Sequence, residues 1–230
     1  MEDVSKLRKI RSFVRRDSRI TASQQRSINQ MLPQFTLPTN AGFINLVQSF
    51  GRTAPKVLEI GFGNGESLAE IAKLQPDHDF IGIETHQPGV GALLLLIEKY
   101  ALSNIRIIYG DAVEILKNNI ASASLDRLQV FFPDPWPKRK HHKRRLINPE
   151  FVSLAASRLK LEGIWHLATD WAHYGQQMMQ VLSKSDKLIN LAGAGSFAPR
   201  SAARPVVTKF EARGTQSGRD IWELQFARCD

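Results

Sequence analysis

Short apolar runs alternate with segments of helical periodicity along most of this chain of 230 residues, and this alternation constrains the fold more than any other feature. Strand–helix–strand units place their strands parallel and their helices on both faces of the sheet. The sequence therefore predicts a doubly wound α/β fold with a mostly parallel sheet. The expected strands are residues 56–61, 79–84, 105–112 (with the following turn), 125–133, 163–170 and 221–227, and the expected helices are residues 66–74, 88–102, 112–119, 149–159 and 171–183.

Acidic side chains follow the expected strands at the positions where such a sheet binds ligands. In an open α/β sheet, ligands lie outside the carboxyl ends of the strands. The residues just after the apolar runs are a glycine-rich turn at 61–65, Glu84, Asp111, Asp134 and Asp170. Four of these five positions carry a carboxylate, so the sequence predicts an acid-lined site at this edge.

The glycine-rich turn, EIGFGNGES at residues 59–67, indicates a cationic ligand. Gly61, Gly63 and Gly65 allow a tight turn and the close approach of a ligand. The spacing is neither the G-x-G-x-x-G of dinucleotide-binding enzymes nor a P-loop, because no Lys-Ser/Thr pair follows. Glu59 would repel a pyrophosphate and attract a sulfonium or ammonium group, which favours S-adenosyl-L-methionine as the cofactor. The alternative is a plain tight turn.

Two further acids fit the remainder of a nucleoside. Glu84 ends the second strand, where a carboxylate can accept hydrogen bonds from both ribose hydroxyls. Its alternative role is a helix N-cap or a surface acid. Asp111 and Ala112 follow the third strand, where an acid can accept a hydrogen bond from the adenine amino group. Capping the next helix is compatible with that role.

The stretch PDPW places one acid in a stiff turn at the end of the fourth strand. Pro133 and Pro135 fix φ on both sides of Asp134, and Trp136 offers a flat surface on which a base can stack. Amine-methylating enzymes use a similar turn to hold the nitrogen that is methylated. A structural turn with an aromatic plug is the alternative. We interpret Asp134 as the acid that faces the reacting base.

A basic run, KRKHHKRR at residues 138–145, follows this turn at once. It holds six Lys/Arg and two His in eight residues. A basic run is often a solvated face or a tail, but this one lies between a strand and a helix, so it should rim the pocket and pair with RNA phosphates. No spaced Cys, His or Asp partners accompany His141 and His142, so no metal site is expected.

Positive charge is concentrated in two separate clusters, which favours nucleic acid as the partner. The net charge is +9, and the first 26 residues carry eight Lys/Arg against three acids. We expect residues 1–35 to form a basic arm, loosely docked or disordered with room for a short helix, and residues 36–230 to form the α/β domain. Arg8, Arg11, Arg15 and Arg16 are expected to help grip RNA, and a passive tail is the alternative.

The remaining composition favours a cytoplasmic protein. The longest apolar stretch is residues 92–97, far below the ~20 residues of a membrane span, and no secretory signal is visible. Cys229 is the only cysteine, so no internal disulfide or thiolate metal cage can form. We expect no membrane and no metal, and a monomer, with a homodimer left open.

Four stretches together resemble the bacterial tRNA (guanine-N7-)-methyltransferase family from about residue 10 to the end of the chain. The resemblance implies a class I methyltransferase (Rossmann-like) fold with a seven-stranded sheet, a tRNA substrate, and methylation of a variable-loop guanine to 7-methylguanosine. Pro137 is a departure, because some members have His there, and we expect only a positional role at this site. The stretches are EIGFGNGESL at 59–68, IGIETHQPGV at 81–90, FPDPWPKRKHHKRRL at 132–146 and TKFEARGTQSGRDIWELQF at 208–226.

The resemblance also implies roles for individual residues. Asp134 would be catalytic. The residues expected to bind S-adenosyl-L-methionine are Glu59, Gly61, Gly63, Gly65, Glu84, Asp111, Ala112 and Asp134. Those expected to hold the substrate are Lys138, Asp170, Thr208, Lys209, Phe210 and Glu211. Those expected to contact RNA are Lys140, His141, His142, Lys143, Arg144 and Arg145.

Guanine N7 carries a lone pair and no proton, so the expected reaction needs placement more than a general base. Asp134, and after it Asp170, would stabilise the cationic product ring, while Glu211 would accept hydrogen bonds from the N–H edge of guanine and Lys209 would pair with a phosphate. One alternative is a class I methyltransferase for another base, rRNA or a small molecule. Another is a non-catalytic RNA-binding protein on a degenerate methyltransferase fold.

Overall fold

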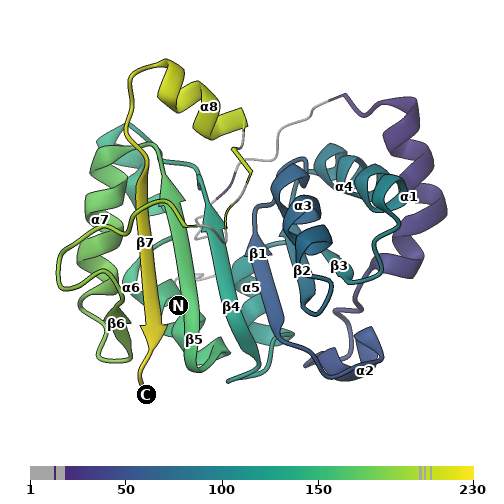
Figure 1. Ribbon diagram of the computed structural model, residues 1–230, viewed down its shortest axis with the longest axis horizontal. Coiled ribbons are helices and arrows are strands. Elements are labelled where there is room, and N and C mark those ends of the chain that lie inside the picture. Colours follow the sequence, from purple (N-terminus) through teal and green to yellow (C-terminus); the bar gives the residue numbers. More distant parts are fainter. Residues whose placement is uncertain (1–12, 14–18, 202–203, 205, 208) are drawn as a thin grey trace, which may run out of the picture.

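A single seven-stranded sheet organises the computed structural model, which describes residues 13, 19–201, 204, 206–207 and 209–230 (Figure 1). The strand order is β3-β2-β1-β4-β5-β7-β6. The first five strands in this order are parallel, whereas β7 pairs antiparallel with both β5 and β6. The strands are β1 (Lys56–Ile60), β2 (Asp79–Glu84), β3 (Ile105–Tyr109), β4 (Leu125–Phe131), β5 (Leu159–Thr169), β6 (Leu188–Asn190) and β7 (Trp222–Arg228).

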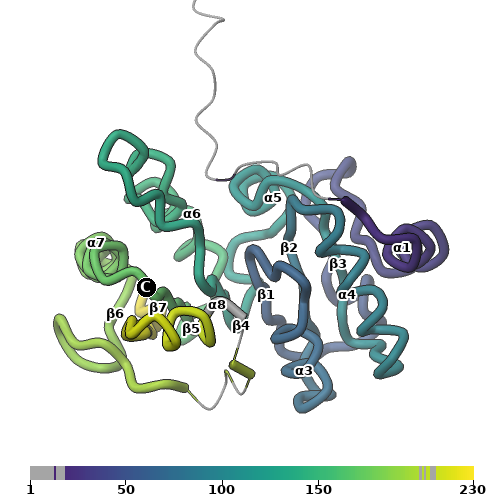
Figure 2. Tube along the Cα trace, turned by 90° about the horizontal axis from the view of Figure 1, so that it is seen from above, coloured from purple at the N-terminus to yellow at the C-terminus, as the bar shows by residue number. Residues whose placement is uncertain are grey.

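Helices cover both faces of the sheet, as Figure 2 shows from above. Alternate strand residues point to opposite faces, so Leu58 and Ile60 enter one apolar cluster and Val57 enters another. The first cluster packs against α5 (Ala112–Asn118), α6 (Pro149–Arg158) and α7 (Ala172–Leu182). The second packs against α3 (Glu66–Leu74) and α4 (Gln87–Tyr100). The prediction of a doubly wound, mostly parallel sheet is confirmed.

Several elements were not placed from the sequence, although a short helix somewhere within residues 1–35 was left open. They are α1 (Ala22–Phe35), α2 (Leu46–Phe50), the 3₁₀ helix η2 (Arg139–Arg144), the edge strand β6 and α8 (Lys209–Gln216). In addition, β5 begins at Leu159, directly after α6. The strand contains a bulge, in which Glu162 has a φ of 62°, before its regular pairing resumes. No helix in the described ranges is long and apolar enough to cross a membrane.

The helix α1 lies within the segment expected to be a basic arm, yet it is docked on α4. Thr21 and Gln24 form a capping box at its start, and Ser27 Oγ donates to Gly91 O at 3.0 Å. A Cβ at Gly91 would lie 2.7 Å from Gln24 Cβ, so the two helices touch where α4 carries no side chain. The helix α1 is therefore part of the folded body, whereas Arg8, Arg11, Arg15 and Arg16 lie outside the described residues.

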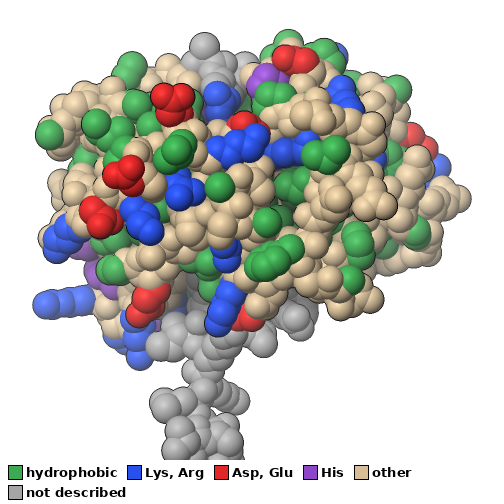
Figure 3. Space-filling model, turned by 90° about the horizontal axis from the view of Figure 1, so that it is seen from below, with side chains coloured by type: hydrophobic (Ala, Val, Ile, Leu, Met, Phe, Trp, Pro, Cys, Tyr) green, Lys and Arg blue, Asp and Glu red, His purple; other side chains and the backbone are tan. Residues whose placement is uncertain are grey.

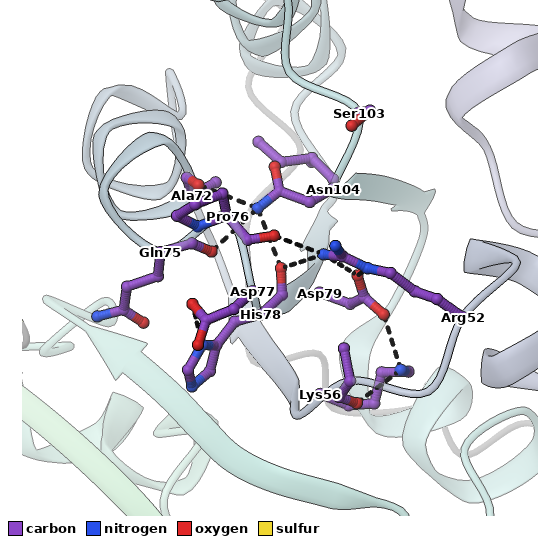
Figure 4. A network of polar contacts seen from close by, with 12 residues as sticks. Arg52, Lys56, Ala72, Gln75, Pro76, Asp77, His78, Asp79, Ser103 and Asn104 are labelled. Carbon is purple, nitrogen blue, oxygen red and sulfur yellow. Dashed lines mark hydrogen bonds and ion pairs between the residues drawn. The ribbon is translucent and has the colours of Figure 1, made fainter.

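A charged network holds the amino ends of β1 and β2 (Figure 4). Lys56 Nζ donates to Asp79 Oδ2 at 2.7 Å, and Arg52 Nε donates to Asp79 Oδ1 at 2.8 Å. Arg52 also donates to the carbonyls of Pro76 and His78, and Asn104 Nδ2 donates to the carbonyls of Ala72, Gln75 and His78. This network joins the turn before β2 to the strands on either side of it.

Candidate active site

The carboxyl ends of the parallel strands bring the predicted acids to one edge of the sheet. Ile60 of β1 pairs in register with Ile83 of β2 and Val130 of β4, so these strands end at the same level. Phe131 pairs with Ala168 of β5, which extends the edge toward Asp170. Figure 1 shows these ends at the upper edge of the sheet, with α8 beyond them. The prediction of an acid-lined edge is therefore consistent with the observed register.

The glycine-rich turn adopts a backbone that only glycine takes without strain. Gly61, Gly63 and Gly65 have φ of 75°, 59° and 76°, in the left-handed region. Gly61 N donates to Ile83 O at 2.8 Å, which joins the turn to β2. A Cβ on Gly89 would lie 2.2 Å from Gly63 O, so the first turn of α4 also presses on this loop. The loop is thus fixed between two elements and presents its backbone to the edge.

Glu59 is buried beneath this turn with one oxygen unsatisfied. Its exposed fraction is 3%, and Oε2 has no hydrogen-bond partner. Burial, and then the negative charge of Glu84, raise the pKa of Glu59 to about 8. A buried polar atom without a partner is costly, so Oε2 is suited to contact a polar or cationic group. The acid is therefore placed to receive a cation, whose charge would favour its ionised form.

Other buried polar atoms around the same turn also lack partners. Ser67 Oγ lies in the first turn of α3, and His86 Nε2 lies at the N-cap of α4. Gln129 of β4 lies in register beside Glu59 and His166, is fully buried, and has neither carboxamide atom bonded. Sequence reasoning did not single out Gln129, although a Gln in an apolar strand is the signal that marks it. Together these atoms form a polar lining suited to a polar cofactor.

Glu84 is held in place by backbone donors. Its Oε1 accepts from Thr85 N at 2.6 Å and His86 N at 2.9 Å, and its Oε2 accepts from Gly63 N at 2.9 Å. These bonds tie the glycine-rich turn to the end of β2. Oε2 accepts from Gly63 N and keeps a lone pair for another donor, so the expected contact with a ribose hydroxyl is chemically compatible with these bonds.

Asp111 caps α5 and also faces a cavity. Its Oδ1 accepts from Val113 N at 3.0 Å, so the helix-cap role considered from the sequence is present. Ala112 follows it as the first residue of the helix and is nearly buried. The cavity has a volume of about 240 Å³ and mixes apolar walls with charged rims. It is lined by Asp111, Val113, Lys143, Arg144, Arg145, Leu146, Asn148, Glu150, Phe151 and Leu154.

Asp134 is exposed in a turn with unusual backbone on both sides. Phe132 and Trp136 have φ of 50° and 46°, a conformation that costs free energy for residues with a side chain. The turn is anchored before Asp134 by Phe132 N, which donates to Ala168 O at 2.8 Å. It is anchored after Asp134 by Arg145 Nε, which donates to Pro135 O at 2.8 Å. Such a constrained conformation is typical of functional sites.

The basic run forms η2 and wraps around Trp136. The guanidinium of Arg144 lies 4.8 Å from the Trp136 ring centroid, and the His141 ring lies 5.8 Å from it. The ring expected to stack on a base therefore contacts two members of the basic run. Lys138, Arg139, Lys140 and Lys143 are exposed, whereas His141, His142 and Arg144 are half-buried. This surface is next to the turn that carries Asp134.

Arg145 differs from its expected role as an RNA contact because it points inward. Its exposed fraction is 1%, and besides Pro135 O it donates to His173 Nδ1 at 2.9 Å and to Gln177 Oε1. Its guanidinium also lies 4.7 Å from the Tyr174 ring centroid. The apolar pair that follows it, Leu146 and Ile147, is buried, and this was the available signal that the basic run ends inside the protein.

The residues expected to hold the substrate are not all available for it. Asp170 accepts from Arg219 Nη1 at 2.6 Å and remains partly exposed. Glu211 is 4% exposed, and its carboxylate accepts from Arg200 Nε at 3.0 Å and from Arg204. Lys138 is exposed. Thr208, together with the side chains of Lys209 and Phe210, lies outside the described part of the structure.

Among the described residues, no group of three or more His, Cys, Asp or Glu side chains could hold a metal ion. The site at this edge is built from carboxylates, glycine backbone and cationic side chains. Its geometry suits an organic cation beside a polyanion.

Comparison with known proteins gives consistent results. A family model described as "Putative methyltransferase" matches residues 53–224. A tRNA (guanine-N(7)-)-methyltransferase of Alcanivorax borkumensis is 50% identical over 222 residues, covering 96% of this chain and 92% of that relative. One of Burkholderia mallei is 53% identical over 222 residues, covering 96% of this chain and 83% of that relative.

The fold also matches solved methyltransferase structures. The 16S rRNA methyltransferase KamB aligns with a TM-score of 0.60 at 12% identity, covering 82% of this chain and 95% of that chain. Identity at this level supports the fold alone, which is that of a class I methyltransferase. Relatives with about half of their residues identical over nearly the whole chain are far more specific, and they show that this protein belongs to the tRNA (guanine-N(7)-)-methyltransferase family.

Proposed function

We propose that this chain transfers a methyl group from S-adenosyl-L-methionine to N7 of a guanine in the variable loop of tRNA, giving 7-methylguanosine. The observation that carries the proposal is the position of the buried, unsatisfied carboxyl of Glu59 on the same sheet edge as the constrained Asp134 turn and the basic run. A tRNA substrate would place this activity in the cytoplasm.

The residues at the edge fit the proposed cofactor. S-adenosyl-L-methionine would supply an electrophilic methyl group on a sulfonium. Glu59, Ser67 and His86 offer buried polar atoms without partners beside the glycine-rich turn. Glu84 would accept from the ribose, and Asp111 with Ala112 would lie against the adenine. Gly61, Gly63 and Gly65 would let this backbone lie close to the ligand, because no side chain stands on it.

Asp134 is the proposed catalytic residue. Guanine N7 already carries a lone pair, so the protein does not have to remove a proton before the transfer. Its main task is to hold the ring in line with the methyl group. The ring becomes cationic as the bond forms, and the exposed carboxylate of Asp134 would stabilise that charge. Asp170 is the second candidate, although its pairing with Arg219 already neutralises much of its charge.

The exposed face of η2 is the proposed tRNA contact. Lys138, Lys140 and Lys143 are exposed beside the Asp134 turn and would pair with phosphates. Arg144 and His141 would support Trp136 as a wall for the guanine or a neighbouring base. The guanine must leave its stacked position, at a cost of a few kcal/mol, which these contacts would offset.

Methyl transfer to unmodified tRNA transcripts tests this function directly. With tritiated methyl donor, the wild-type protein should label tRNA, and aniline treatment should cleave the labelled RNA at the variable-loop guanine. Asp134→Asn should lose the label and keep tRNA binding. Label in another nucleoside would favour a different base specificity, and label in rRNA or a small molecule would favour the corresponding alternatives. Binding of tRNA without any transfer would favour a non-catalytic RNA-binding protein.

A further inference from the structure

A buried charged network lies behind the Asp134 turn, and the reaction described above makes no use of it. Its centre is Arg204, which is fully buried. Around it lie Glu211 of α8, Glu223 of β7 and His166 of β5, with exposed fractions of 4%, 1% and 1%. Such a group of buried ionisable residues is rare unless it is fully paired, so its connections identify its task.

One guanidinium joins two separate elements. Arg204 Nη1 and Nη2 both donate to the carboxylate of Glu211, with Nη2 lying 3.1 Å from Oε1. Arg204 Nη2 also donates to Glu223 Oε2 at 2.9 Å. The other oxygen of Glu223 accepts from Ser201 N at 2.8 Å and lies 2.6 Å from His166 Nε2. Arg204 therefore ties α8 to the antiparallel part of the sheet.

The same guanidinium packs against the base of the Asp134 turn. It lies 5.9 Å from the Phe131 ring centroid and 5.6 Å from that of Phe132. Phe131 also meets the His166 ring edge-on at 4.9 Å. Phe132 is one of the two residues with positive φ that flank Asp134, so Arg204 supports the part of the turn where the backbone is constrained.

The charges in the network depend on one another. Burial alone would raise the pKa of Glu223, but hydrogen bonds from His166, Arg204 and Ser201 bring it below its ordinary value. Burial would likewise raise the pKa of Glu211, and Arg204 and Arg200 lower it. Both carboxylates are therefore ionised at neutral pH. Burial lowers the pKa of His166, which leaves the imidazole neutral and able to donate to Glu223.

We propose that Arg204 is a positioning residue that fixes α8 against the turn at residues 131–136, so that α8 and Asp134 face one guanine in a set geometry. This inference rests on the proposed function. It also changes the expected role of Glu211, whose carboxylate serves as an anchor for Arg204 and Arg200 rather than as a contact to guanine. Lys has a single ammonium and cannot bridge two carboxylates with a planar fork, so only Arg suits this position.

The test compares Arg204→Met with a matched control, Arg158→Met. Arg158 is also buried, and it donates to Leu116 O, Ser122 Oγ and Lys117 O at the opposite edge of the sheet. Both variants should melt at lower temperature than wild type. At a temperature where both are folded, with saturating cofactor and tRNA, Arg204→Met should lower the single-turnover rate about 100-fold, because a small misplacement of reacting groups costs this much. Arg158→Met should keep the wild-type rate.

Two conservative variants separate positioning from stability. Arg204→Lys keeps the charge and should recover the melting temperature more than the rate. Glu223→Gln removes one ionic partner without changing its size, and it replaces Arg204→Met if that variant does not fold. In each case the rate should fall far more than cofactor affinity, since Asp134 is the one expected cofactor-binding residue on the turn that Arg204 supports.

Equal rates for Arg204→Met and Arg158→Met would overturn the proposal, as would a rate loss in Arg204→Met that is matched by an equal loss of cofactor affinity. Wild-type protein in the same assay separates a failure of the role proposed for Arg204 from a failure of the proposed function. A wild type that transfers no methyl group to tRNA would overturn the proposed function itself.

Discussion

The two edges of the sheet both bury charged side chains, and the clearest contrast is between the Lys56–Asp79 pair and Glu59. At the amino edge, Lys56 and Asp79 have side-chain exposures of 4% and 0% and bond each other directly (Figure 4). At the carboxyl edge, Glu59 is equally buried and leaves Oε2 without a partner. The Lys56–Asp79 pair is thus satisfied within the chain, whereas Glu59, unlike the paired Arg204 network at the same edge, has a carboxyl oxygen that no described residue satisfies.

The surfaces of the two edges also differ in how their charged side chains are distributed. Seen from below, the amino edge carries both basic and acidic side chains (Figure 3). Arg52 pairs with Asp79 there, and Lys160 pairs with Asp126 at 2.8 Å. At the carboxyl edge, η2 presents a run of cations next to the exposed Asp134. Lys160 and Asp126 neutralise each other, whereas the exposed cations clustered on η2 favour a polyanionic partner.

Asp134→Asn should give the largest effect, because it removes the carboxylate at the constrained turn and keeps its shape. We expect turnover to fall by about 10³-fold, the scale for one electrostatic group at a reacting centre. Single-turnover transfer to tRNA is the measurement. Asp77→Asn is the matched control, since Asp77 is an exposed acid in the turn before β2 and contacts only its own side of the sheet. Equal activity of the two variants would contradict the contrast between the edges.

Asp79→Asn should act in the opposite way, on stability and not on transfer. It leaves the ammonium of buried Lys56 without its charged partner, which should cost about 3–5 kcal/mol of the free energy of unfolding. Urea denaturation measures this loss, and methyl transfer by the folded fraction should be unchanged. Adding Lys56→Met to Asp79→Asn should return part of the stability. A double variant that is less stable than Asp79→Asn would show that the pair is not coupled.

The strands and their terminal acids could be predicted because both depend on local sequence. The apolar runs at 56–60 and 79–84 and the helix at 66–74 have clear periods, and the acids follow directly from their ends. Docking of α1 could not be predicted, since it depends on the contact of Ser27 with a carbonyl of α4 far along the chain. The antiparallel insertion of β7 between β5 and β6 could not be predicted either, because an alternating pattern identifies a strand but not the strands that pair with it.

The position of the acids at the sheet edge could be predicted, but the side chains that brace this edge could not. The apolar pair Leu146 and Ile147 indicates that the basic run ends inside the protein, but the partners that hold Arg145 there come from α7 and could not be identified from the run itself. Arg204 stands in a stretch without periodicity, so its two carboxylate partners, Glu211 and Glu223, could not be paired with it from sequence. Local pattern therefore finds residues at strand ends better than the distant residues that pack behind them.

The unsatisfied carboxyl of Glu59 should make cofactor binding depend on pH. With a pKa of about 8, Glu59 is mainly neutral at pH 6, and a cation selects its ionised form. Affinity should therefore rise about tenfold per pH unit between about pH 6 and pH 7.5 and level off near the pKa. Calorimetry in two buffers should detect proton release on binding, and Glu59→Gln should abolish it.

The same pKa predicts the stability of the cofactor-free protein. The folded chain holds the proton of Glu59 more tightly than the unfolded chain, whose value is 4.5. Stability from this group is complete at low pH and is lost as the pH rises from about 4.5 to about 8. Saturating cofactor should reduce this loss. A melting temperature with the same pH profile in wild type and Glu59→Gln would contradict this account.

Lysines on η2 should give the smallest effect, distributed over several residues. Lys140→Ala removes one exposed cation near Asp134, so tRNA affinity should fall a few-fold and the slope of log affinity against log salt should shrink by about 1. Filter binding over a range of salt concentrations measures both. Lys184→Ala, an exposed lysine just after α7, is the matched control and should leave the slope unchanged.

Arg145→Gln should also leave the slope unchanged while lowering the melting temperature, because its guanidinium is held inside by Pro135 O, His173 and Gln177. A reduced slope in Arg145→Gln would mean that this residue reaches RNA after all, and that the inward-facing end of the basic run belongs to the binding surface.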